Sequence, residues 1–332
     1  MADQARFTEV AMEHMPGLYS AAMRMTRNAA DAEDLVQETY LRAWRSYDSF
    51  EGRSSVRTWL YQIATNACLT ALSRRDRRVL PSGLYDAEPD PAVWPEDAGP
   101  DVAWLDPVPD TLAIPEAADP AVIVTARESL RLALIASLQY LPPRQRAVLV
   151  LRDVLEFPAA QVAVMLDTTT ASVKSALQRA RARLEEVAPA ADQITEPDIP
   201  QARALLDEYI AAFENADAAA LERLLVEDVI LEATPLRSWF SGRRACIPFL
   251  RDRVLGAAGD WRMLATGANG QPAAAVYARD ADGQLQPYGV CVLTVTDRGI
   301  SQVTSFGNPG LLAVFGFPPE PGLTGPWTPT SR

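Results

Sequence analysis

The 332-residue chain contains one histidine and three cysteines. The histidine, His14, lies near the amino end, which excludes histidine-based acid–base catalysis in the distant carboxy-terminal half. Cys68, Cys246 and Cys291 are isolated, without CxxC or Cys/His spacing, a pattern that favours neither a metal site nor a disulfide framework. We therefore predict that the protein uses no metal and no cofactor.

Other motifs are missing as well. No glycine-rich phosphate loop precedes a predicted helix, and no serine lies in a nucleophile elbow. The sequence has no signal peptide and no apolar run of ~18 residues, the length that a transmembrane helix needs. We expect a soluble, cytoplasmic protein with no membrane partner, long enough for three small domains.

Basic residues are absent from one long segment. The chain has a net charge of −12, and residues 79–126 hold ten acidic side chains but no lysine or arginine. Residues 1–78 hold 11 basic and 10 acidic side chains, residues 127–186 hold 9 and 6, and residues 187–332 hold 11 and 17. Because DNA affinity scales with the phosphates that a protein neutralises, a free chain of this charge should bind DNA weakly.

The acidic segment also contains nine prolines and shows little periodicity. This composition predicts an extended or disordered linker over residues 79–126. Four apolar side chains in it would provide transient anchor points: Trp94, Val102, Trp104 and Leu105.

A helix-turn-helix pattern follows the linker. An apolar helix is predicted over Ala159–Leu166, then a polar break at Asp167–Thr169, then a basic helix from about Thr170. Thr169 or Thr170 would cap the second helix. Apolar residues spaced by three or four positions would form one shared seam between the helices. They are Val162, Met165, Leu166, Val173, Ala176, Leu177 and Leu184.

The second helix would present a polar and basic face to DNA. Its amino end offers free N–H groups to a phosphate, and its exposed side chains would reach base edges in a major groove. A basic helix alone is often only a solvated surface, but the preceding helix favours DNA binding here. The candidate DNA-contacting residues are Thr169, Thr170, Ser172, Lys174, Ser175, Gln178, Arg179 and Arg181.

Two further helices are predicted near the amino end. Asp34–Trp44 has helical spacing and carboxylates at its amino end, where they favour a helix. Arg57–Leu69 mixes aromatic and cationic residues and leads into the basic run Arg74–Arg78. Aromatic rings beside cations suit unstacked single-stranded bases. We predict that Trp44 is a core residue and leave the role of Trp59 open.

Three stretches resemble the sigma-70 family of bacterial RNA polymerase specificity subunits, and within it the extracytoplasmic-function group. They are AEDLVQETYLRAWRSYDSF at Ala32–Phe50, RTWLYQIATNACL at Arg57–Leu69 and the helix-turn-helix region at Leu141–Leu184. The resemblance implies contact with the core polymerase at the beta-prime clamp helices and the beta flap. The residues expected to bind the core polymerase are Asp34, Leu35, Gln37, Glu38 and Leu41.

The same resemblance assigns the two basic blocks to promoter DNA. The helix beginning near Thr170 would read the minus-35 element, and the Phe50–Arg78 block would open and read the minus-10 element. The acidic linker would either be a passive tether or occupy a nucleic-acid channel of the polymerase. One departure is the turn, which usually carries glycine, whereas Asp167–Thr169 stands here. The residues assigned to the minus-10 element are Arg53, Arg57, Trp59, Asn66, Arg74, Arg75 and Arg77.

Beyond a second linker, the sequence predicts helices followed by a curved antiparallel sheet, which is α+β architecture. Asp282-Gly283 would form a hairpin turn between two strands. The predicted helices are Gln201–Asn215, Ala218–Leu225 and Arg243–Leu255, and the predicted strands are Asp228–Thr234, Trp261–Gly267, Ala273–Arg279, Tyr288–Thr296 and Ile300–Phe306.

The region Gln201–Pro319 resembles the SnoaL-like, NTF2-like cone domains. A subgroup of these sigma factors carries such a domain as a carboxy-terminal regulator in cis, often in place of a separate anti-sigma protein, and Asn308–Leu311 is similar to a motif at its end. The expected fold is thus two all-α domains followed by an α+β cone. The expected domains are 1–78, a linker 79–126, the helix-turn-helix domain 127–188, a linker 189–200, the cone 201–320 and a tail 321–332.

A cone of this kind can hold a small molecule. Asp228 and Glu232 are separated by an even number of strand positions and should share a face, with Tyr277 or Tyr288 as proton donor and Trp239 in the same pocket. Surface carboxylates and core aromatics explain these residues more simply. We therefore predict a sigma factor that is not an enzyme. The alternatives are a helix-turn-helix regulator acting without polymerase, or a DNA reader fused to an isomerase-like or cyclase-like domain.

Overall fold

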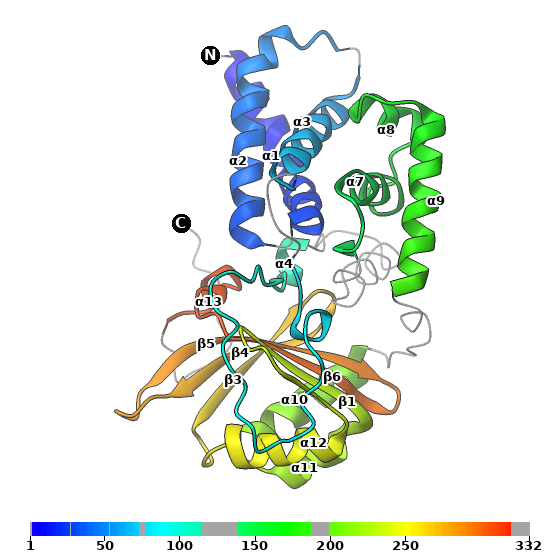
Figure 1. The fold of residues 1–332 in the computed structure, drawn as a ribbon. Coiled ribbons are helices and arrows are strands. Elements are labelled where there is room, and N and C mark those ends of the chain that lie inside the picture. The colour runs from blue at the N-terminus through cyan, green and yellow to red at the C-terminus, as the bar shows by residue number, and fades with distance from the viewer. Residues whose placement is uncertain are drawn as a thin grey trace. The chain divides into compact units, whose positions relative to one another are not determined.

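The computed structural model describes residues 2–26, 28–52, 54–72, 78–113, 138–187 and 199–319, which fall into two compact units (Figure 1). The first unit comprises residues 1–78 and 110–192, and the second comprises residues 79–109 and 193–332. The chain therefore leaves the first unit for 31 residues before returning to it. Most of the predicted acidic linker that the structure describes belongs with the carboxy-terminal unit.

The first unit is helical among its described residues. Two of its helices are followed directly by tighter or wider turns, a 3₁₀ turn at Tyr47–Ser49 after α2 and a π turn at Val150–Val154 after α7. The helices are α1 (Ala2–Thr26), α2 (Ala29–Ser46), α3 (Val56–Leu72), α4 (Asp110–Ala113), α7 (Pro143–Leu149), α8 (Ala159–Met165) and α9 (Thr170–Val187).

Helix α2 starts at a side-chain cap and has one buried face. The Asn28 side chain accepts a hydrogen bond from the Asp31 N–H at 2.9 Å, which satisfies one of the free donors of the first turn. Ala32, Leu35 and Ala43 are buried on the side that packs against α1 and α3. The opposite side of the helix stays exposed.

The predicted helix-turn-helix is present. Val162, Met165 and Val173 are buried between α8 and α9, as the seam predicts. The turn contains a residue with positive φ, and it is Asp167, at 47°, rather than a threonine. Because aspartate tolerates the left-handed region better than threonine does, the turn forms without glycine. Thr169 is the cap, accepting from the Ser172 N–H at 3.1 Å.

Contacts across the first unit connect α3 to the helix-turn-helix. The rings of Tyr61 on α3 and Phe157, just before α8, meet edge to face with centroids 5.1 Å apart. The buried Arg146 on α7 donates to the Met25 carbonyl at 2.7 Å, and burial lowers the pKa of Arg146 to about 10. A buried cation that bonds backbone carbonyls needs correct packing around it, so this contact specifies how α7 meets α1.

The second unit contains a six-stranded sheet in the order β2-β1-β6-β5-β4-β3. Four neighbouring pairs are antiparallel, but β1 and β6 are parallel, so the sheet is mixed and the prediction of a purely antiparallel sheet is wrong. The strands are β1 (Leu225–Thr234), β2 (Trp239–Ser241), β3 (Trp261–Ala268), β4 (Gln271–Arg279), β5 (Leu285–Thr296) and β6 (Gly299–Phe306).

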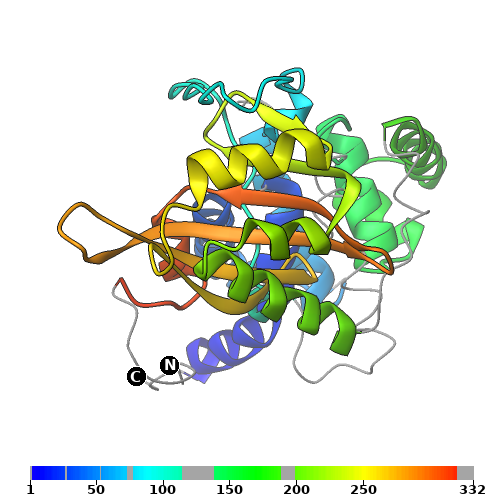
Figure 2. The same cartoon turned by 90° about the horizontal axis from the view of Figure 1, so that it is seen from below.

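Helices cover one face of this sheet (Figure 2). The hairpin predicted at Asp282-Gly283 joins β4 to β5, with Gly283 at a φ of 79°. The main core of the unit lies between the covering helices and the sheet, and a smaller cluster that includes Tyr277 and Leu312 lies apart from it. The helices of the unit are α10 (Ile199–Glu214), α11 (Ala218–Leu224), α12 (Arg243–Phe249), which continues as a π turn to Val254, and α13 (Gly310–Val314).

Residues 79–109, which we call the strap, pack on the cone as an irregular extended segment (Figure 1). The strap forms a parallel bridge from Ala87 to Trp239 and an antiparallel bridge from Asp97 to Leu236. At its end the Asn269 N–H donates to the Val108 carbonyl at 2.9 Å. The described part of the predicted extended or disordered linker is thus an irregular segment that makes hydrogen bonds to the cone as well as apolar contacts.

Candidate nucleic-acid interface and carboxy-terminal cavity

Helix α2 presents a continuous exposed face. Asp34, Gln37, Glu38 and Leu41 lie on it at spacings of three and four residues. Leu35, which was predicted to bind alongside them, is instead buried in the first unit's own core.

Trp44 continues the same exposed face. Its side chain is 41% exposed and that of Leu41 is 56% exposed. The prediction that Trp44 is a core residue is therefore wrong. Trp44 lies three residues after Leu41 and so shares its face of the helix. Because both the buried and the exposed face of α2 carry apolar residues, periodicity alone could not tell which face is buried.

Three of the predicted minus-10 residues, Arg57, Trp59 and Asn66, lie on helix α3. Asn66 is exposed, and Trp59 is half-buried against Phe50, with ring centroids 4.9 Å apart. The other four predicted residues, Arg53, Arg74, Arg75 and Arg77, lie outside the described residues.

Arg57 is held by the other half of the first unit. Its guanidinium lies 4.3 Å from the ring centroid of Phe157 and donates to the Leu155 carbonyl at 3.2 Å. A cation placed over an aromatic face in this way is attracted by the ring. In this conformation the Arg57 guanidinium faces protein, so DNA would have to compete with Phe157 for it.

The predicted minus-35 residues all lie on the exposed face of α9 and its cap. Arg181 makes a two-point ion pair with Asp153, at 2.8 and 3.0 Å, and this pair raises the pKa of Arg181. Arg179 donates to the Ser175 hydroxyl one turn earlier. The exposed residues are Thr169, Thr170, Ser172, Lys174, Ser175, Gln178, Arg179 and Arg181.

This arrangement can enter a DNA groove. Side chains from the cap and the first turns of α9 point away from the seam, and the α9 amino end adds its free N–H groups. Arg179 is available to phosphate or to a base, whereas Arg181 would first have to leave Asp153. The geometry therefore ranks Arg179 above Arg181 as a DNA contact.

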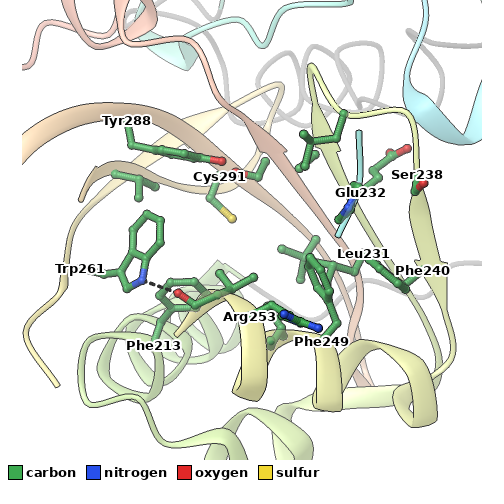
Figure 3. A pocket seen from close by; sticks show the side chains of 18 of the residues that line it. Phe213, Leu231, Glu232, Ser238, Phe240, Phe249, Arg253, Trp261, Tyr288 and Cys291 are labelled. Atoms are coloured by element: carbon green, nitrogen blue, oxygen red, sulfur yellow. Dashed lines mark hydrogen bonds between the residues drawn. The ribbon is translucent and has the colours of Figure 1, made fainter. Parts of the chain in front are cut away.

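An apolar cavity of about 200 Å³ lies inside the cone (Figure 3). Its rings pack against one another, with Phe240 and Phe249 stacked at 4.2 Å and Trp261 edge to face with Tyr288 at 5.3 Å. The strap contributes Trp94 and Pro95 to the same wall. The aromatic residues that the cone contributes are Tyr209, Phe213, Phe240, Phe249, Trp261 and Tyr288.

Glu232 is the buried carboxylate beside this cavity. It accepts hydrogen bonds from Gln302 Nε2 at 2.7 Å, from the Thr304 hydroxyl at 3.2 Å and from the Ser82 N–H at 3.1 Å. Burial raises the pKa of Glu232 above its usual 4.5, although these donors act in the opposite direction. Glu232 thus connects β1 and β6 to the strap.

Of the five residues predicted for the cone pocket, Glu232 and Tyr288 line the cavity and the other three do not. Asp228 is exposed, because an irregularity in β1 between Leu225 and Ile230 breaks the two-residue alternation. The prediction that Asp228 and Glu232 share a face is therefore wrong.

The two aromatic residues that lie away from the cavity have other partners. Tyr277 donates to the Pro318 carbonyl at 2.8 Å within the smaller cluster. Trp239 donates from its indole nitrogen to the Tyr85 carbonyl of the strap at 2.8 Å. Sequence reasoning missed the contribution of Trp94 and Pro95 to the cavity, because a linker tryptophan carries no signal of where it docks.

None of the described helices is long and apolar enough to cross a membrane. In the same part of the chain, no three or more His, Cys, Asp or Glu side chains come together as metal ligands would.

Two family descriptions match the chain. "Sigma-70 region 2" matches residues 10–78, which contain α2 and α3, and "Sigma-70, region 4" matches residues 131–184, which contain the helix-turn-helix. The ECF RNA polymerase sigma factor SigG of Mycobacterium tuberculosis is 47% identical over 303 residues, which cover 91% of this chain and 81% of the relative. SigJ of the same species is 34% identical over 213 residues, covering 64% and 60%.

The crystal structure of Mycobacterium tuberculosis SigJ has the same fold, with a TM-score of 0.60 at 22% identity over 94% of this chain and 99% of that chain. The match spans both units, so helical regions followed by a mixed α+β domain describe the fold. Helix α2 lies within the region 2 match and helix α9 lies largely within the region 4 match. SigG is similar over most of the chain. The chain therefore belongs to the extracytoplasmic-function group of RNA polymerase sigma factors, which direct core polymerase to promoters.

Proposed function

We propose that this sigma factor binds core polymerase through the exposed face of α2 and reads promoter DNA through α3 and α9. The exposed α9 face, presented by a capped helix-turn-helix, is the observation that carries the proposal. Asp34, Gln37, Glu38 and Leu41 would meet the beta-prime clamp helices, with the beta flap as a second contact. Leu35 acts from inside the core by holding α2 in place.

The minus-10 element would be opened by the Phe50–Arg78 block. Arg57 must exchange Phe157 for DNA, since its guanidinium lies over that ring. The minus-10 and minus-35 elements are roughly 25 base pairs apart, or about 85 Å at 3.4 Å per base pair. The free chain has a net charge of −12 and would have little DNA affinity of its own. Binding to core polymerase would therefore supply the free energy that places α3 and α9 at the two promoter elements.

The cone would regulate the factor in cis by restraint. The strap is part of the only covalent connection between α3 and α7, and the cone binds it along its length. A linker held in this way has fewer conformations in which regions 2 and 4 reach both promoter elements at once. The cone would therefore lower transcription until the strap is released.

We propose no catalytic activity for the cone, and the factor would act in the cytoplasm together with RNA polymerase. Acid–base catalysis needs a group that can exchange protons with a substrate. Glu232 already accepts three hydrogen bonds from protein, and Asp228 lies on the surface. A small molecule bound in the cone would serve as a regulator.

The test is run-off transcription with core polymerase and two charge reversals. Glu38→Arg on α2 should abolish core binding and the transcript together. Arg179→Glu on α9 should leave core binding within about twofold but weaken minus-35 DNA binding about tenfold or more, since a good contact of this kind contributes roughly 1–3 kcal/mol.

Arg203→Glu provides the control, because Arg203 is an exposed arginine on α10 in the other unit. It should change neither core binding nor transcription. Loss of core binding by Arg179→Glu would instead assign the α9 face to protein, and wild-type activity of Glu38→Arg would remove α2 from the polymerase interface.

A further inference from the structure

The cone cavity is closed on one side by a segment from outside the cone. Trp94 and Pro95 of the strap line it together with residues of the sheet and of α10 and α12. Pro95 is buried, and the Trp94 ring lies 6.0 Å from the Phe249 ring although the tryptophan side chain is 57% exposed. One side of the Trp94 indole therefore faces the cavity region while much of the rest faces solvent.

The size of the cavity limits its occupant. A dry cavity of about 150 Å³ lined by aliphatic and aromatic side chains holds benzene. At about 200 Å³, this cavity would hold roughly eight non-hydrogen atoms by the same scale, which is one ring with a substituent or a small fused pair of rings such as indole. Aromatic rings line the cavity on several sides, among them Phe213, Phe249 and Trp261 (Figure 3). Such walls favour a flat molecule.

The polar groups of the wall are already bonded to protein. Glu232 accepts from three donors, and the Trp261 indole nitrogen donates to the Val254 carbonyl at 2.9 Å. The Arg253 guanidinium, at the rim, donates to the Ala92 carbonyl of the strap at 2.6 Å. A charged group inside the cavity would lose its water while Glu232 and the Trp261 indole are already bonded to protein and Arg253 lies at the rim, so the wall disfavours charge.

The strap is fastened on both sides of Trp94. Before it, the Glu88 N–H donates to the Trp239 carbonyl at 2.7 Å, and after it, the Ala98 N–H donates to the Pro235 carbonyl at 3.0 Å. The Arg237 N–H donates to the Glu96 carbonyl at 2.8 Å next to Pro95. These bonds place Trp94 and Pro95 at the cavity, and their rupture would open it.

We propose that the cavity binds an uncharged, mainly apolar molecule of one or two rings, and that the strap is its lid. The molecule binds when the strap is closed, so its binding and the attachment of the strap to the cone favour each other. This deepens the proposed function, because the ligand would strengthen the restraint that the cone places on the linker between the two DNA-reading regions. The binding itself requires no polymerase.

The coupling is reciprocal by thermodynamic necessity. If the ligand binds only the closed form, the ratio of closed to open strap rises by the factor 1 + [L]/Kd. At a ligand concentration nine times Kd, that factor is about ten. Conversely, a substitution that opens the strap must lower the affinity of the cavity for the ligand.

The first experiment measures binding of indole, an uncharged two-ring probe, to the full chain by equilibrium dialysis. Benzoate is a charged counterpart of similar size and should not bind. Val303→Phe, which adds a ring to a cavity-lining position, should abolish binding of indole. Val295→Phe is the matched control, since Val295 is buried in the same core without lining the cavity. It should retain binding, with both variants checked for an unchanged cooperative melt.

The second experiment follows hydrogen exchange of the Glu88 and Ala98 amides in the full chain. With indole at nine times Kd, exchange at both should slow about tenfold. Trp94→Ala needs no core rearrangement, because Trp94 is largely exposed, and it should weaken indole binding about threefold to tenfold through the lost ring contact. Val93→Ala, at the exposed neighbour that does not line the cavity, should leave binding unchanged.

Specific results would overturn the proposal. Absence of binding by indole, phenol and toluene up to their solubility limits would remove the ligand site. Binding without slower exchange at Glu88 and Ala98, or binding that Trp94→Ala leaves intact, would remove the lid. Neither result bears on core and promoter binding, which transcription of the Glu38→Arg and Arg179→Glu variants tests separately.

Discussion

At the scale of single residues, Glu232 is a carboxylate that the fold holds away from water. Glu232 is 1% exposed, and its raised pKa means that the folded chain binds a proton more readily than the unfolded chain does. The stabilisation from this proton is complete below the unfolded value of 4.5 and is lost as pH rises through the folded pKa. Glu232 thus makes the cone less stable as the pH rises from acid toward neutral.

The prediction is tested with Glu232→Gln, which removes the titration. The difference in unfolding free energy between wild type and Glu232→Gln should decrease from pH 4.5 to pH 7.5, measured by urea unfolding followed by tryptophan fluorescence. The groups facing the carboxylate are Gln302, Thr304 and the Ser82 N–H, none of which titrates in this range. Glu208→Gln, on the exposed side of α10, should show no such trend. A difference that grows with pH would contradict a raised pKa.

Asp167 is the second enforced residue, with a φ of 47° in the turn between α8 and α9. A β-branched residue there should cost about 1–2 kcal/mol of unfolding free energy, because its Cβ clashes in the left-handed region. We expect Asp167→Val to show this loss in urea unfolding and Asp167→Gly to stay within about 1 kcal/mol of wild type.

Thr170→Val is the control for the turn, because Thr170 lies at the start of α9 and does not have a positive φ. An equal loss of unfolding free energy from Thr170→Val and Asp167→Val would attribute the effect to the removed polar group or to the valine itself, and not to the backbone of the turn.

At the scale of elements, α2 has one face buried in its own domain and one exposed face that we propose binds core polymerase. Leu35→Ala should lower the unfolding free energy by about 2–5 kcal/mol, the usual cost of removing a buried leucine. Trp44→Ala should lower it by less than about 1 kcal/mol, because Trp44 is 41% exposed, yet weaken core polymerase binding. Calorimetric melting and a binding titration with core polymerase measure the two effects. A large loss of unfolding free energy from Trp44→Ala would instead show that Trp44 packs as a core residue.

Most elements could be predicted from periodicity and turn chemistry. The α8–turn–α9 pattern and strands β3 to β6 match their predicted ranges closely, because repeated apolar spacing and a Gly283 turn are local signals. The parallel pairing of β1 with β6 could not be predicted, since it joins strands about 70 residues apart. The irregularity in β1 that separates Asp228 from Glu232 is likewise set by that long-range pairing.

The candidate DNA and polymerase surfaces were more predictable than the cavity. A basic helix face is a property of one element, and the eight α9 positions are all exposed as expected. The cavity combines residues of α10, α12, all six strands and the strap, and its wall is complete only when all are in place. Phe240, Phe249 and Trp261 show the limit, because each is both a core residue and part of the cavity wall.

At the scale of the whole molecule, most of the described linker between sigma regions 2 and 4 packs on the cone, for which we propose a regulatory role. Deleting only residues 201–332 would free the strap and leave its buried side chains, such as Leu105 and Val108, without the cone. A smaller change separates release of the strap from loss of the cone. Trp239→Phe removes the hydrogen bond to the Tyr85 carbonyl, and Arg237→Ala removes both the ion pair with Glu96 at 3.4 Å and the contact with the Tyr85 ring.

If the cone restrains the factor, the Arg237→Ala/Trp239→Phe double variant should raise promoter-specific run-off transcription severalfold, and the 201–332 deletion should raise it at least as much. The reason is that each lost bond lowers the cost of freeing the strap by about 0.5–1.5 kcal/mol. Arg243→Ala is the control, since its ion pair with Glu227 lies within the cone and away from the strap. Lower transcription from the double variant, with core binding unchanged, would show that the fastened strap aligns the two readers instead of restraining them.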